Sequence, residues 1–72
     1  MRTLNLAHIP ANTTEGRVMA GVIIESLTCK KAKAEQHCEG DYHHSTYYVK
    51  AGNKRYSCTF HRFRKQATIN EL

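Results

Sequence analysis

The chain has 72 residues, with eleven Lys or Arg against six Asp or Glu, so its formal net charge is +5. A chain this short makes one domain with a thin core, so we expect residues 1–72 to gain stability from a partner subunit, a metal or a bound ligand, most commonly by homodimerisation. It has no apolar run of the ~20 residues that span a bilayer and no signal-peptide pattern, and we therefore expect a cytoplasmic protein that does not enter a membrane.

The first predicted element is a short strand. Residues 2–9 alternate for a few positions, with Leu4 and Leu6 on one side, which is typical of a half-buried strand, and Pro10 ends it. Asn12 is followed three residues later by Glu15, the spacing of a capping box that opens a helix.

From Glu15 onward apolar residues recur at helical spacing, which predicts a helix over about residues 14–36. The β-branched run Val22–Ile24 and two nearby glycines keep a strand over residues 17–27 open as an alternative. A helix over 14–36 would be longer than the strands of a small sheet. Its second half must therefore project, or the helix must break near Cys29.

A β-hairpin is predicted for residues 45–63. Residues 45–51 are rich in strand formers, Gly52 and Asn53 follow as the turn, and residues 54–63 resume the alternation. One face of the second strand then carries Tyr56, Cys58 and Phe60, and the other carries Arg55, Ser57, Thr59 and His61.

The order strand, helix, strand, strand predicts an α+β fold, a two-layer sandwich in which one helix covers a three-stranded antiparallel sheet. Residues 39–41 predict a turn. Residues 65–72 contain little apolar material, so we expect a flexible tail or a marginal helical turn.

The whole charge excess lies between residues 50 and 65, where six cations occur without an acid and aromatic side chains are interleaved. A local positive field of this kind attracts a phosphate backbone, and exposed aromatic rings can stack on bases. An alternative explanation needs no ligand: lysines near turns and sheet edges often only prevent one sheet edge from pairing with another. We expect a small intracellular protein that binds nucleic acid, DNA or RNA, without catalysis. The predicted binding residues are Lys50, Lys54, Arg55, His61, Arg62, Arg64 and Lys65.

Other functions fit the same composition. A short basic chain also suits an inhibitor or host-takeover protein of the kind that phages encode, docking its positive face on an acidic partner protein. A metal-independent ribonuclease would need His, Tyr and Arg side chains, but no motif fixes their geometry, so we expect no enzyme. The side chains of those types are His43, His44, His61, Tyr47, Tyr48 and Arg62.

Cysteine and histidine residues could form a zinc site from two pairs, Cys38 with His43 and Cys58 with His61. In a regular strand Cys58 and His61 point to opposite faces, so we expect no metal and no cofactor. Three cysteines cannot all pair within one chain, and we expect reduced thiols.

The predicted helix has a wider apolar stripe than a three-stranded sheet can cover. We therefore expect homodimerisation through this helix, with Val22 and Ile24 at the interface.

Overall fold

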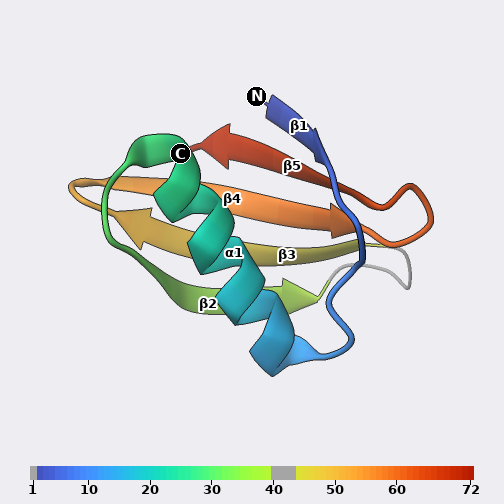
Figure 1. Cartoon of the computed structure of the whole chain (residues 1–72). Coiled ribbons are helices and arrows are strands. Elements are labelled where there is room, and N and C mark those ends of the chain that lie inside the picture. The colour runs from blue at the N-terminus through green and yellow to red at the C-terminus, as the bar shows by residue number, and fades with distance from the viewer. Residues whose placement is uncertain (1, 40–43) are drawn as a thin grey trace.

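The computed structural model describes residues 2–39 and 44–72, with the side chains of residues 36–39 left outside the description. These residues form one helix and five strands. The elements are β1 (Arg2–Asn5), α1 (Thr13–Thr28), β2 (Ala32–Glu39), β3 (His44–Ala51), β4 (Lys54–His61) and β5 (Gln66–Glu71). The strands make one antiparallel sheet in the order β1-β5-β4-β3-β2, and α1 crosses one face of it (Figure 1). The predicted α+β class is confirmed, whereas the three-stranded sheet is wrong.

The beginning of α1 follows the sequence signal. Asn12 has an extended backbone, with φ −152° and ψ 177°, and its Oδ1 accepts a hydrogen bond of 2.8 Å from the Glu15 backbone N–H. This bond satisfies one of the backbone donors that the first helical turn leaves without a partner. The Glu15 carboxylate lies 3.3 Å from His8 Nε2.

The end of α1 corrects the predicted helix, which does not continue to residue 36. Cys29 adopts a left-handed conformation, with φ 58°, and its N–H donates to the Glu25 carbonyl, which ends the helix after Thr28. Residues 32–39 form β2 instead. Their polar composition favours a helix locally, but pairing with β3 satisfies the backbone and turns Ala32 and Ala34 towards the core. The alternative strand over residues 17–27 is also wrong.

The segment 65–72, expected as a flexible tail, contains β5. This strand lies between β1 and β4, so both of its edges have backbone partners. Ala67 and Ile69 alternate inward and are buried. Two buried apolar side chains are enough to order this strand, because β1 and β4 also satisfy its backbone hydrogen bonds on both edges.

The predicted hairpin is confirmed as β3 and β4, joined at Gly52, whose φ of 63° is the left-handed conformation that glycine adopts most easily. The predicted alternation of β4 also holds for its inner face. Cys58 and Phe60 are buried beneath α1, while Arg55 is exposed.

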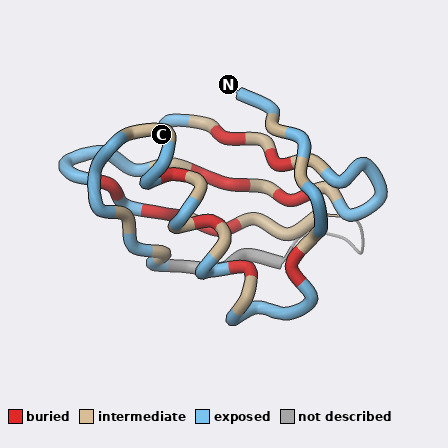
Figure 2. The backbone as a smooth tube through the Cα atoms, in the orientation of Figure 1, coloured by how far each residue is buried: buried red, intermediate tan, exposed pale blue. Residues whose placement is uncertain are grey.

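The core lies between α1 and the sheet, where most of the buried positions face each other (Figure 2). Small and aliphatic side chains fill it together with the aromatic rings of Tyr47 and Phe60. Ala20 and Ile24 of α1 are fully buried against Val49 and Cys58 of the central strands. Gly16 lets α1 approach the sheet closely, because a Cβ atom there would overlap the ring of Tyr47. Within the described residues, no helix has both the length and the apolar character needed to cross a membrane.

The two predicted interface residues lie on different sides of α1. Ile24 is fully buried against its own sheet, which removes it from the predicted dimer interface, whereas Val22 is 60% exposed. The helix packs mainly against β2, β3 and β4, which leaves the part of the apolar stripe that contains Val22 uncovered. Val22 lies beside Val18 in a shallow groove between α1 and the edge strand β2.

Candidate nucleic-acid interface

The face of the sheet opposite α1, here called the open face, carries a row of three cations. The register pairs Lys33 of β2 with Lys50 of β3, and Lys50 with Arg55 of β4. Directly paired residues point to the same face with Cβ atoms about 4.5–5.5 Å apart. All three side chains are exposed. Like charges in direct opposition destabilise a sheet, so this cation row is unfavourable for folding alone.

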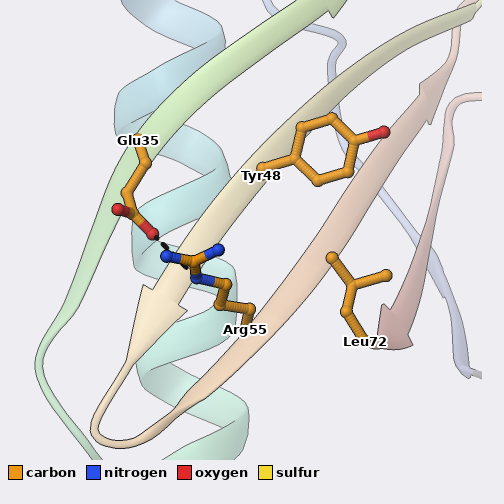
Figure 3. Close-up of a pocket in the computed structure, with 4 residues that line it drawn as sticks. All are labelled: Glu35, Tyr48, Arg55 and Leu72. Atoms are coloured by element: carbon orange, nitrogen blue, oxygen red, sulfur yellow. Dashed lines mark ion pairs between the residues drawn. The ribbon is translucent and has the colours of Figure 1, made fainter.

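A hollow of about 350 Å³ lies beside the cation row and is lined by Glu35, Tyr48, Arg55 and Leu72 (Figure 3). The β2–β3 register shifts between Ala34 and Gln36, which leaves Glu35 as the extra residue of a bulge. The Arg55 side chain turns towards Glu35, and its Nε lies 3.7 Å from Glu35 Oε1. This distance is an ion pair but too long for a hydrogen bond.

Hydroxyl groups occupy the middle of the open face. Thr46 of β3 and Thr59 of β4 are register partners, and their Oγ1 atoms lie 2.9 Å apart. Further towards β1, Gln66 Nε2 donates to Asn5 Oδ1 at 3.1 Å. These groups are neutral, so the positive charge of the face lies towards its ends.

Two histidines lie at the end of the open face farthest from the cation row. His44 and His61 are register partners, and their rings meet edge to face with centroids 4.8 Å apart. His61 Nε2 lies 2.8 Å from Thr68 Oγ1. The pKa of His61 is lowered below its usual value. The main cause is partial burial of the ring, and the charges of His44 and Arg64 add to it. The two rings line a second hollow together with the β4–β5 turn, whose residues there are Arg62, Phe63 and Arg64.

The structure divides the predicted binding residues into two groups. Lys50, Lys54 and Arg55 lie at the β3–β4 turn. His61, Arg62, Arg64 and Lys65 lie at the β4–β5 turn. The length of β4, about 23 Å at 3.3 Å per residue, separates the two groups. Lys54 is also on the opposite register face from Arg55, and its Nζ is 2.9 Å from Glu71 Oε1. The predicted binding residues of the β3–β4 hairpin and the turn after it therefore do not form one continuous basic surface.

Four residues of this region were not among the predicted binding residues, namely Lys33, Glu35, Tyr48 and Leu72. Lys33 and Glu35 fell inside the predicted helix, so nothing in the sequence placed them beside Lys50 and Arg55. Tyr48 had a usable signal, because strand alternation puts it on the same face as Lys50.

The zinc candidates do not come together in the described residues, where no group of three metal-ligating side chains occurs. Cys58 lies in the core under α1, where burial raises the pKa of its thiol to about 12, while His61 hydrogen-bonds on the open face. Their opposite orientation is as expected from the strand alternation. His43 and most of the predicted turn at 39–41 lie outside the described residues, as do the side chains of His37 and Cys38.

The residue types of a ribonuclease are only partly assembled. His44 and His61 are in contact, but Tyr47 is buried on the helix face against Phe60, with ring centroids 5.6 Å apart. Tyr48 is four residues from His44 along β3, about 13 Å at the rise of a strand.

Comparison with protein-family models, with curated proteins and with solved structures finds no match to this chain.

Proposed function

We propose that the protein binds nucleic acid without catalysing a reaction, using the open face of the sheet together with the β4–β5 turn. The observation that carries the proposal is the cation row of Lys33, Lys50 and Arg55. Three cations in direct opposition raise the free energy of the fold, an effect that Glu35 offsets in part at Arg55, and a bound phosphate lowers the remaining repulsion. The arrangement is therefore more favourable with an anionic ligand than without one.

The surroundings of the cation row support a polyanion rather than a single anion. A second group of cations stands about 23 Å away along β4, and neutral hydroxyl and amide groups lie between the two groups. A chain of phosphates can contact both ends at once, which a small anion cannot. Serine, threonine and asparagine side chains also commonly bind phosphate and sugar oxygens.

The experiment measures affinity for a short oligonucleotide over a series of salt concentrations. Lys33→Ala with Lys50→Ala should weaken binding and flatten the slope of log K against log salt, by about 0.7 for each lost contact with a single strand. The triple variant Arg62→Ala, Arg64→Ala and Lys65→Ala should do the same from the other end. A control with Arg2→Ala removes a charge on β1, the edge strand farthest from β2, and should leave the slope nearly unchanged.

An acidic partner protein is the competing ligand, since it responds to the same cations. Two results together would replace our proposal with an acidic protein partner. The chain would fail to bind oligonucleotides even at low salt, and wild type, but not the Lys33/Lys50 variant, would capture an acidic protein.

We also propose that the chain forms a homodimer through the groove between α1 and β2. Support comes from Val18 and Val22, 62% and 60% exposed, which lie beside the edge strand β2. A second copy could pair its own β2 edge there while covering the two valines. Val22→Asp should then dissociate the dimer, because it puts an unpaired charge in the interface. Sedimentation equilibrium tests this: a wild-type chain that stays a monomer of 8.2 kDa at high micromolar concentration would contradict it.

A further inference from the structure

The hollow beside the cation row has a chemistry that phosphate binding does not use. We propose that the ligand is single-stranded, and that one unpaired base bearing an amino group occupies the hollow formed by Tyr48, Leu72, Arg55 and Glu35. This inference rests on the proposed function, and it specifies which form of nucleic acid binds and which bases are accepted.

The apolar side of the hollow is suited to the flat surface of a base. Tyr48 is half-buried in the inner strand β3, and Leu72 follows β5, its backbone N–H donating to the Arg55 carbonyl at 2.8 Å. Figure 3 shows the Tyr48 ring and Leu72 on one side of the hollow, across from the Arg55–Glu35 pair. Every base has a π-face that stacks on an aromatic ring, and a guanidinium plane can add to that contact.

The polar side of the hollow distinguishes between bases. A carboxylate accepts hydrogen bonds and cannot donate them, so Glu35 is complementary to the amino group of cytosine, adenine or guanine. Thymine and uracil present a carbonyl oxygen where cytosine has its amino group, so a carboxylate at that position meets an acceptor and can accept only from the neighbouring N3–H. Because Arg55 Nε lies 3.7 Å from Glu35 Oε1, the carboxylate is oriented by charge while its lone pairs can still accept from a base.

The cation row lies at the right distance from the hollow for the phosphate of the same nucleotide. Lys50 is two residues from Tyr48 on the same face of β3, about 7 Å along the strand, and Lys33 stands opposite Lys50. A base stacked on Tyr48 would therefore bring its backbone next to both lysines. A paired base offers neither a free face nor a free Watson–Crick edge, so a duplex cannot make this set of contacts.

The test is fluorescence anisotropy with three labelled probes of equal length, oligo-dC, oligo-dT and a duplex, at one low salt concentration. We expect wild type to bind oligo-dC more tightly than either of the others. Tyr48→Leu should weaken oligo-dC binding about 5- to 140-fold, the range of one lost base–aromatic stack, and leave duplex binding unchanged. Tyr48→Phe keeps the ring and should bind like wild type, which separates stacking from any loss of folding.

Glu35→Gln tests base selection. Glutamine can donate to the thymine carbonyl, so the ratio of oligo-dC to oligo-dT affinity should fall towards one, even though removing a negative charge strengthens binding to every probe. Arg2→Ala, on the edge strand β1 farthest from β2, is the control and should leave the ratio at its wild-type value.

The outcomes separate this inference from the proposed function. Equal affinity for duplex and single strand, or unchanged oligo-dC affinity in Tyr48→Leu, would overturn the inference while nucleic-acid binding stands. An unchanged oligo-dC to oligo-dT ratio in Glu35→Gln would overturn the base selection. No binding of any probe would overturn the proposed function itself.

Discussion

The two faces of the sheet are built from alternate residues of the same strands, yet they have opposite chemistry. Under α1, Val49 and Cys58 are fully buried in a close-packed layer. One residue further along each strand, Lys50 and Thr59 lie on the open face among cations and hydroxyl groups. Neighbouring residues of one strand therefore have different roles. The face under α1 determines stability, and we propose that the open face determines binding.

The largest expected difference in stability is between substitutions at Ile24 and Val22, two residues of α1 that are two positions apart. Ile24→Ala should lower the free energy of unfolding by about 2–5 kcal/mol, because Ile24 is fully buried and the change leaves a cavity. Val22→Ala, at a 60% exposed position, should change it by no more than about 0.5 kcal/mol. Urea unfolding at low protein concentration measures both, and equal losses would contradict the assignment of α1 faces.

Two glycines of α1 should respond to alanine with opposite signs. Gly16→Ala forces a Cβ atom into the buried ring of Tyr47 and should cost about 1–3 kcal/mol. At Gly21 the new Cβ would lie 3.8 Å from the Ala32 carbonyl, an ordinary contact, so Gly21→Ala should stabilise the helix by about 0.5–1 kcal/mol. Thermal unfolding of the two variants compares them directly, and a gain at both sites would mean that α1 stands farther from β3 than the structure has it.

The cation row predicts a variant that is more stable but binds less well. Lys50→Gln removes the central charge of the row and should raise the free energy of unfolding by about 0.2–1 kcal/mol, while lowering affinity for an oligonucleotide. Lys54→Gln is the matched control. Its hydrogen bond and charge interaction with Glu71 raise the pKa of Lys54, so its loss should bring no gain in stability. If Lys50→Gln were destabilising, the repulsion we infer would be absent.

The smallest effect concerns pH at the histidine end of the open face. The folded pKa of His61 is below its unfolded value of about 6.5, so the unfolded chain binds more protons. The contribution of His61 to stability is therefore full above pH 6.5 and declines as the pH falls through the folded pKa. His61→Gln should flatten the fall in stability between pH 7 and pH 5, measured by urea unfolding. An identical pH profile in both proteins would show that the environment of His61 does not shift its pKa.

Local signals predicted the parts of the fold that depend on few residues. The hairpin followed from the alternation on either side of Gly52, and the helix start followed from the spacing of Asn12 and Glu15. The end of α1 and the strand β2 could not be predicted in this way. Residues 30–36 have helical preference, and only pairing with β3, which is a tertiary contact, makes the strand more favourable.

The candidate site was less predictable than the fold because it depends on register. The charge excess pointed to Lys50 and Arg55, but the third cation of the row, Lys33, became visible only once β2 was paired with β3. The same pairing creates the bulge that brings Glu35 to the hollow. A pattern along one strand reports its own two faces, whereas a row across strands requires knowledge of which residues stand opposite each other.

Because Cys58 is buried, the reactivity of its thiol can measure the fraction of molecules in which the core is transiently open to solvent. A thiol reacts as the thiolate, and with a pKa of about 12 only about one thiol in ten thousand is ionised at pH 8. In a variant with Cys29→Ser and Cys38→Ser, modification by a thiol reagent would then require the layer between α1 and the sheet to open. A ligand that binds the far side of the sheet only in the closed form lowers the population of the open form by the factor 1 + [L]/Kd. The labelling rate of a sulfur that touches no ligand would thus report, without any added fluorophore, whether the opposite face is occupied.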